Sequence, residues 1–502
     1  MSMRRRFVIV CFAAGLAALQ AAVRGQGSET VIAIVGATVI DGNGGQPLPD
    51  ATVVVTGKRI SAVGPRASVQ VPGGAQVIDG AGRFVTPGFI DANVHLSMFG
   101  NLEQLARYQD RAVEIALESA QLHLKHGVTT VRDSYGQLNA LVKVRDMIAR
   151  GEAPGPRMLV AGNIVGWGGP FSVSFSVTRD AGLSPFQERF NDEITQGSGE
   201  ELMDMSLDEL RTAMNAYLDK GPDFIKYGGT GHFWYPTFIG FSPDAQKVIV
   251  DETHKRKRFA ETHSTSVEGL RLSVLAGIDL IQHPEYLTPR EMPDELVKLI
   301  VERKVICAIS ANNAYHGEAW QKHLEDKAEA EKSAKKAESE GGLARRPKTL
   351  AEQRKERQDL GLDREMWRRN AQKLIQGGAI IAIASDNTVT YPPEYTRPPK
   401  PDYRQAGIAS LIAIEGMVEL GMTPAQAITA GTKNGGLASG RLAEFGTIEA
   451  GKLADLVVLD ANPLADIHNI RKQRVVMKEG RIFDAGSLPE RPVLYRRSSK
   501  TN

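Results

Sequence analysis

The segment from Thr86 to Gly100, "TPGFIDANVHLSMFG", determines how this chain is interpreted. Its apolar residues follow a Pro-Gly pair, which predicts a short strand that ends at His95. Asn93 and His95 are two residues apart, so on a strand both side chains point to the same face. The sequence therefore predicts two neighbouring polar side chains at the end of a buried strand.

The middle of the chain, about residues 87–443, repeats this pattern of a short apolar run followed by a helical stretch. Amphipathic segments such as "SLDELRTAMNAYLDKG" separate the runs. This alternation predicts an α/β fold, a closed (β/α)8 TIM barrel. An open doubly wound sheet is the alternative, but no glycine-rich phosphate loop follows a first strand. The eight expected strands are "GFIDANVH", "GVTTVRDS", "GPRMLVAG", "PDFIKYGG", "KRFAETHS", "IDLIQHPE", "KVICAIS" and "AIIAIASDN".

The two ends of the chain have a different character from the middle. Residues 30–86 and 444–490 are rich in β-branched runs and tight turns, so we expect them to form one composite β-sandwich domain. A segment at about 313–370 is dense in Lys, Glu, Ala and Arg, which predicts a solvated helical insertion. Because it follows the seventh expected strand, it could also form a lid or a substrate wall.

The N-terminus has the composition of an export signal. Within residues 1–25, three arginines precede an apolar run that is short for a membrane span. We expect cleavage, a periplasmic or secreted protein and no stable membrane insertion after removal of the signal; an uncleaved anchor is the alternative. Cleavage would leave Cys307 as the single cysteine, so no intrachain disulfide is expected. The net charge of +2 in 502 residues gives no reason to expect nucleic acid binding.

Polar residues stand at the ends of five of the expected strands. Residues from the ends of separate strands converge on one pocket in a closed barrel, so their joint occurrence is a stronger signal than any single histidine. These residues are Asn93, His95, Lys226, His263, His283 and Asp386.

Several of these segments resemble the amidohydrolase superfamily. "PGFIDANVH" is similar to the family pattern Pro-Gly-hydrophobe-Ile-Asp-x-His-x-His, and "GTIEAGKLADLVVLDANPLADI" and "VVMKEGRIFD" resemble its C-terminal sheet. The resemblance extends from about Val31 to Asp484. It is greatest to the branch of secreted dipeptidases and N-acyl amino acid hydrolases, which carries a lysine on strand four that we match to Lys226.

The resemblance implies a metal site and a role for each residue. Lys226 would be carboxylated and would bridge two metals, with His263 and His283 on the outer one. His95 and Asp386 would hold the inner metal, with Asn93 in the place of the first histidine. Zn²⁺, as one or two ions, suits these ligands. Asp386 would also be catalytic, since it can take a proton from water and return it to the leaving amine. An uncarboxylated Lys226 would instead be a buried ion-pair partner.

Two positions depart from the family pattern. The amide oxygen of Asn93 is a weaker donor than imidazole, so the inner metal should be held weakly or be absent. Pro170 stands where the branch has a histidine in a Gly-Gly-His sequence. His232 could contact substrate or replace a ligand, although a solvent-exposed loop histidine is the simpler interpretation.

The function predicted from the sequence is metal-dependent hydrolysis of an amide bond in a peptide or N-acyl amino acid, as in a dipeptidase or carboxypeptidase-like amidase. A small molecule or short peptide would be the substrate, and we expect a homo-oligomer. The alternatives are a catalytically silent binding or scaffold protein on the same barrel, and another superfamily member of lactonase, deaminase or isomerase type.

Overall fold

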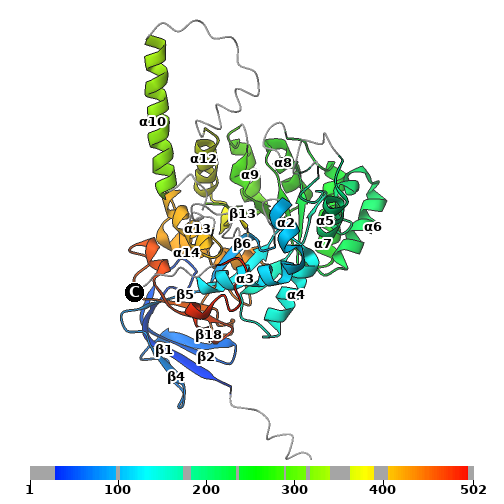
Figure 1. The fold of residues 1–502 in the computed structure, drawn as a ribbon. Helices are drawn as coiled ribbons and strands as arrows, with labels where there is room; N and C mark the ends of the chain where they lie inside the picture. Colours follow the sequence, from blue (N-terminus) through cyan, green and yellow to red (C-terminus); the bar gives the residue numbers. More distant parts are fainter. Residues whose placement is uncertain are drawn as a thin grey trace, which may run out of the picture.

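Figure 1 shows the chain in a computed structural model, with a β-rich unit at one end of a larger α/β body. The predicted signal at residues 1–25 and the middle of the charged insertion, residues 340–361, lie outside the described residues. The structure describes residues 29–97, 102–172, 174, 182–232, 237–287, 290–311, 317–339, 362–388 and 405–495.

The β-rich unit is one sheet built from both ends of the chain. Its strand order is β18-β17-β16-β5-β1-β2-β3, and β4 also pairs with β1. The two ends meet where β5 runs antiparallel to β16, with Val85 opposite Val458. The further division of this sheet into a sandwich stays a prediction. The strands are β1 Val31–Val39, β2 Leu48–Thr56, β3 Arg59–Pro65, β4 Gln76–Asp79, β5 Phe84–Pro87, β16 Leu456–Leu459, β17 Gln473–Lys478 and β18 Arg481–Phe483.

All eight strands expected in the middle of the chain are present, and they pair in parallel. Nearly every residue in them is buried, because helices cover their outer side (Figure 1). The strands and two short extensions are β6 Phe89–His95, β7 Val128–Asp133, β8 Arg157–Val160, β9 Ile164–Val165, β10 Ile225–Gly228, β11 Ala260–His263, β12 Leu280–Gln282, β13 Ile306–Ile309, β14 Ile380–Ile383 and β15 Asn387–Thr388.

The single closed ladder predicted for the barrel is not formed by the described strands. They pair as a six-stranded sheet, β14-β13-β12-β11-β10-β9, and a four-stranded sheet, β15-β6-β7-β8. The reason is that the third and the eighth expected strands are each interrupted. Of their segments, β8 and β15 pair in the four-stranded sheet, whereas β9 and β14 pair in the six-stranded sheet. Gly162, with φ of 78°, separates β8 from β9, and Asp386, with φ of 50°, separates β14 from β15. Left-handed backbone cannot continue a strand, so the ladder breaks at both places.

Helices alternate with these strands and bury one face against them. Their apolar residues and those of the strands make one large core, which includes Ile225, Ile249 and Leu270. In chain order, the α-helices of the described residues are α2 Leu102–Tyr108, α3 Ala112–Lys125, α4 Leu138–Ala149, α5 Pro185–Thr195, α6 Leu207–Leu218, α7 Pro243–Lys255, α8 Val267–Ala276, α9 Asp294–Glu302, α10 Gly317–Ser339, α12 Leu362–Gln376, α13 Ile408–Glu419, α14 Pro424–Ala430 and α15 Lys433–Ala438.

The described parts of the charged insertion are helical, as predicted. Helix α10 extends away from the body, whereas α12 packs beside α9 (Figure 1). Glu365 of α12 accepts a hydrogen bond of 2.6 Å from Lys327 of α10 and joins the two helices. Among the described helices, none combines the length and apolar character that crossing a bilayer requires.

Two contacts fix the sheet against the α/β body. The chain passes from β5 into β6 at Gly88, where a Cβ atom would lie 2.2 Å from the Thr129 hydroxyl oxygen, so no larger residue fits without movement. Arg157, at the start of β8, donates to Asp455 at 2.7 Å and to Glu479 at 2.9 Å on the C-terminal segment. The Arg157 and Asp455 side chains are only 8% and 5% exposed, so this ion pair is buried between the two units.

We predict that Arg157→Met lowers the free energy of unfolding by about 3 kcal/mol, because it leaves the Asp455 carboxylate buried without its cation. Chemical denaturation measures the change. The control is Arg271→Gln, which removes an exposed ion pair with Glu268 and should leave the denaturation midpoint unchanged. Equal midpoints for the two variants would show that Arg157 does not hold the units together.

Candidate functional site

The six residues predicted for the site all lie at the carboxyl ends of the parallel strands. Asn93 and His95 end β6, Lys226 lies on β10 and His263 ends β11. His283 directly follows β12, Asp386 lies three residues after the end of β14, and both have positive φ angles, of 37° and 50°. Such backbone costs on the order of 1–3 kcal/mol for a residue other than glycine, and it is concentrated at functional sites.

The first and last strands contribute a group centred on the Asp386 carboxylate. Its Oδ1 accepts a hydrogen bond from Asn93 Nδ2 at 3.0 Å and lies 3.1 Å from His95 Nε2. Burial alone would raise the pKa of Asp386, but the hydrogen bond with His95 and the nearby His283 and Lys226 lower it below its usual range. The carboxylate is therefore ionised at neutral pH, and His95 Nε2 must be the donor to it.

His263 and His283 form a second group. Nδ1 of His263 lies 3.1 Å from Nε2 of His283, and both rings are buried. Burial lowers the pKa of His283 to about 3, and burial together with the neighbouring His283 lowers the pKa of His263 well below its usual value. Both imidazoles are therefore neutral at pH 7, which is the form that binds metal ions.

Lys226 interacts electrostatically with both groups. It is 2% exposed, and within the described residues its ammonium makes no hydrogen bond or ion pair. Burial lowers the pKa of Lys226, while Glu261, Asp386 and Asp133 oppose this effect. Glu261 is itself held by Arg132 at 2.6 Å, so it does not neutralise Lys226 directly.

Aromatic rings line the side of the site formed by His263. The ring of Trp167 lies 4.6 Å from that of His263 and donates its Nε1–H to the backbone oxygen of Thr230. His232 stacks at 5.8 Å on His263 and is half-buried, not exposed as the simpler interpretation of the sequence proposed. Trp167 lies in the same loop as Pro170, so this loop contributes an indole ring to the His263 side of the site.

Aromatic rings also flank the other two histidines. Tyr286 stacks on His283 with a centroid distance of 5.1 Å, and Tyr135 packs edge-on against His95 at 6.2 Å. Trp367 of α12 lies 4.6 Å from Tyr286. The charged insertion therefore supports one wall of the site through α12.

Asp91 positions the first group, although its role was not predicted from the sequence. Its carboxylate accepts hydrogen bonds from the backbone N–H groups of Asn93 and Ser385, each at 3.1 Å, and from the Ser410 hydroxyl at 2.6 Å. These bonds tie the end of β6 to the segment that carries Asp386. The sequence "PGFIDANVH" does indicate such a role, because an acidic residue within an apolar strand is expected to be buried and a buried carboxylate needs hydrogen-bond donors.

The donor set fits a divalent metal. Among the described residues, no three His, Cys, Asp or Glu side chains gather as one metal-binding group; the ligands lie in two pairs with Asn93 and Lys226 beside them. Two nitrogen ligands of a tetrahedral Zn²⁺ are separated by about 3.4 Å, which follows from the usual Zn–N distance. The separation of 3.1 Å between the His263 and His283 nitrogens is close to this value.

Comparison with known proteins agrees with this arrangement. The model of the amidohydrolase family matches residues 84–483, which is most of the chain and includes every strand that carries a site residue. The chain belongs to the amidohydrolase family.

Two solved structures are similar to this amidohydrolase over nearly its full length. The structure of molinate hydrolase is 30% identical, covers 95% of this chain and 100% of its own, and has a TM-score of 0.78. Phenylurea hydrolase B is 32% identical, with coverage of 93% and 100% and a TM-score of 0.80. A Xaa-Pro dipeptidase with bound methionine is 20% identical with a TM-score of 0.68, which shows the fold alone.

Among curated proteins, the ochratoxinase of Aspergillus niger is 23% identical over 314 residues. That match spans 57% of this amidohydrolase and 62% of the relative's own length. Within the family, the dipeptidase and N-acyl amino acid hydrolase branch and the carboxylation of Lys226 stay predictions.

We predict that Asp91→Ala destabilises the amidohydrolase by about 3 kcal/mol, because it leaves two buried N–H groups and a hydroxyl without an acceptor. Urea denaturation measures the loss. Ser410→Ala is the matched control, since it removes one of the three bonds and should cost about 1 kcal/mol. If both variants lose the same stability, the backbone bonds to Asp91 do not hold the strand ends.

Proposed function

We propose that this protein is a metal-dependent hydrolase that cleaves a carbon–nitrogen bond next to a carbonyl group in a small molecule. The observation that carries the proposal is the neutral His263–His283 pair at the same end of the sheets as the ionised Asp386. Neutral imidazoles and a carboxylate are the donors that bind Zn²⁺ and leave a coordination position open.

The residues of the chain have separate tasks in this proposal. His263 and His283 would hold the metal, with His95, Asp386 and a carboxylated Lys226 as further ligands. A divalent cation held there supplies Lewis acid activation of water and of the substrate carbonyl. Asp386 accepts hydrogen bonds at Oδ1, its side chain is 29% exposed, and no described residue donates to Oδ2. Oδ2 is thus placed to take a proton from water and pass it to the leaving nitrogen.

The structure also supports a specific role for Asn93. Its amide nitrogen donates to Asp386, while its buried Oδ1 has no hydrogen-bond partner among the described residues. We propose that Asn93 orients Asp386 and is at most a weak ligand, so the protein holds fewer than two metals tightly. An amide oxygen binds a borderline ion less strongly than imidazole does.

For the substrate, we propose a small compound with an N-carbonyl group and an apolar or aromatic part. The two similar structures with 30% and 32% identity are those of a molinate hydrolase and a phenylurea hydrolase. In this protein the aromatic rings of Trp167 and Tyr286 flank His263 and His283, where they could contact an apolar or aromatic part of a substrate. A dipeptide or N-acyl amino acid, as predicted from the sequence, is the second candidate, and the substrate screen described below distinguishes the two. Export to the periplasm or medium and homo-oligomerisation remain part of the proposal.

We predict that activity depends on a metal. The purified protein, supplied in turn with Zn²⁺, Mn²⁺ and Co²⁺, is screened against phenylureas, dipeptides and N-acyl amino acids. Treatment with a chelator should abolish the hydrolysis found, and return of the ion should restore it. Hydrolysis that persists in fully metal-free protein would refute the mechanism; a protein without metal and without activity would favour the silent scaffold.

We predict that Asp386→Asn lowers kcat at least about a hundredfold, because the amide cannot accept the proton. The variant should keep the far-UV circular dichroism spectrum of the wild type. The conservative change Asn387→Ser, at the neighbouring position, serves as the control for local disturbance. Near-normal turnover in Asp386→Asn would exclude this residue as the base.

We predict that Asn93→His raises the number of metal ions retained per chain after dialysis. Position 93 faces the same side of β6 as His95, so an imidazole there adds a ligand without altering His263 or His283. Metal content of the wild type and variant, determined by elemental analysis, tests this. Two full equivalents in the wild type would show that the site beside Asn93 already binds metal well.

A further inference from the structure

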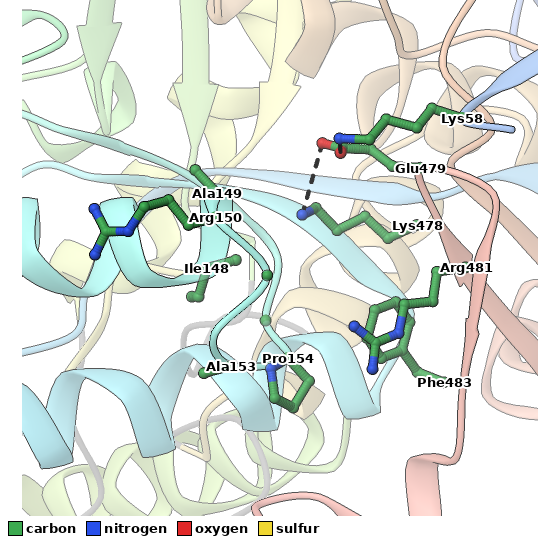
Figure 2. Close-up of a pocket in the computed structure, with 12 residues that line it drawn as sticks. Lys58, Ile148, Ala149, Arg150, Ala153, Pro154, Lys478, Glu479, Arg481 and Phe483 are labelled. Carbon is green, nitrogen blue, oxygen red and sulfur yellow. Dashed lines mark hydrogen bonds and ion pairs between the residues drawn. The ribbon is translucent and has the colours of Figure 1, made fainter. Parts of the chain in front are cut away.

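A second cavity lies at the opposite end of the strands from the metal ligands. It has a volume of about 280 Å³ and lies between the sheet unit and the loop that joins α4 to β8 (Figure 2). Because that loop precedes β8, the cavity is at the amino end of the strand, whereas His263 and Asp386 follow their strands. We call this cavity the basic cleft; its charged lining residues are Lys58, Arg150, Lys478, Glu479 and Arg481.

The basic cleft contains more positive than negative charge. Four of its lining residues are cationic and one, Glu479, is acidic. Glu479 already pairs with Lys58 at 3.0 Å and with Arg157, outside the lining, at 2.9 Å. Arg150 points away from the cleft and pairs with Glu152 (Figure 2). The unbalanced charge therefore resides on Lys478 and Arg481.

Lys478 gives the main evidence that the basic cleft can bind an anion. Its side chain is only 9% exposed, yet its one ion pair, with Glu479, is long at 3.7 Å. Figure 2 marks this contact with a dashed line, and no described residue lies within hydrogen-bond distance of the ammonium, which borders the cleft. Burial lowers the pKa of Lys478, and the nearby Glu479 and Asp455 carboxylates only partly oppose this effect. Because its one ion pair is long, the ammonium at the edge of the cleft can still donate hydrogen bonds to a bound anion.

Arg481 and Phe483 extend the site toward solvent. Arg481 is exposed, forms no ion pair within the described residues, and lies 5.1 Å from the ring of Phe483. Phe483, Ile148 and Pro154 give the cleft an apolar wall beside its cations. A cavity of this size is at the small end of ligand-binding pockets, so it suits a compact molecule.

We propose that the basic cleft binds a small organic anion, with its phosphate or carboxylate group on Lys478 and Arg481 and its apolar or aromatic part against Phe483. Such a ligand would contact the sheet unit and the α4–β8 loop at once. It would therefore stabilise the docking of the two units and raise the melting temperature as its concentration increases. The proposal is independent of metal binding and of the reaction at the other end of the strands.

The test uses the full-length protein with phenyl phosphate, benzoate and inorganic phosphate as probes. Calorimetric titration and thermal melting should both show saturable binding of phenyl phosphate or benzoate, tighter than that of inorganic phosphate because of the apolar wall. The probe with the higher affinity, phenyl phosphate or benzoate, shows whether the cleft prefers a phosphate or a carboxylate group. Absence of saturable binding by either aromatic probe would overturn the proposal.

Variants locate the binding. Lys478→Gln and Arg481→Gln should each weaken the aromatic anion about tenfold or more, since each removes a charged hydrogen-bond donor. Arg474→Gln is the matched control and should not change the affinity, since Arg474 is an exposed arginine of β17 that pairs with Asp460 and does not line the cleft. Arg481 is exposed, so its variant decides the outcome if Lys478→Gln does not fold. Equal affinity in Arg481→Gln and Arg474→Gln would place the anion elsewhere and overturn the proposal.

Discussion

The buried carboxylate of Asp91 is the constraint on which the site depends. It binds the first strand of the α/β body to the segment after the last strand through two backbone N–H groups and Ser410. Together with the backbone bond from Asp386 to Asn93 and the pairing of β15 with β6, these contacts bring Asn93 and Asp386 side by side. The same segment leaves the strand geometry at Asp386, so the residue that breaks the ladder is also the one turned into the site.

Burial then decides which charges the site carries. Desolvation lowers the pKa values of His263 and His283, so both rings remain neutral and keep their nitrogen lone pairs. Asp386 is half-buried, but desolvation is outweighed by the hydrogen bond with His95 and the interaction with Lys226, which hold its pKa low and keep it ionised. Neutral imidazoles beside an ionised carboxylate are donors that suit a divalent cation. This combination arises because these polar side chains stand at strand ends within an apolar core.

The two ends of the strands therefore differ in electrostatic character. The carboxyl ends present imidazoles and a carboxylate that suit a cation. The amino end of β8 carries Arg157, and the neighbouring C-terminal hairpin adds Lys478 and Arg481, which suit an anion. The cleft depends on the Arg157–Asp455 ion pair, because this contact holds the sheet unit against the body.

The sequence by itself determined the eight strand positions and the set of polar residues at their ends, because alternation of apolar runs and amphipathic helices is a local property. It also indicated that both chain ends are β-rich. Only the tertiary structure decided that Asp91 binds Ser410, that Trp167 packs on His263 and that His232 is half-buried beside them, since these contacts join residues far apart in the chain. Only there, too, does Lys478 become a largely buried cation: it ends β17 beside a cavity that the α4–β8 loop also lines, and no local sequence pattern records that proximity.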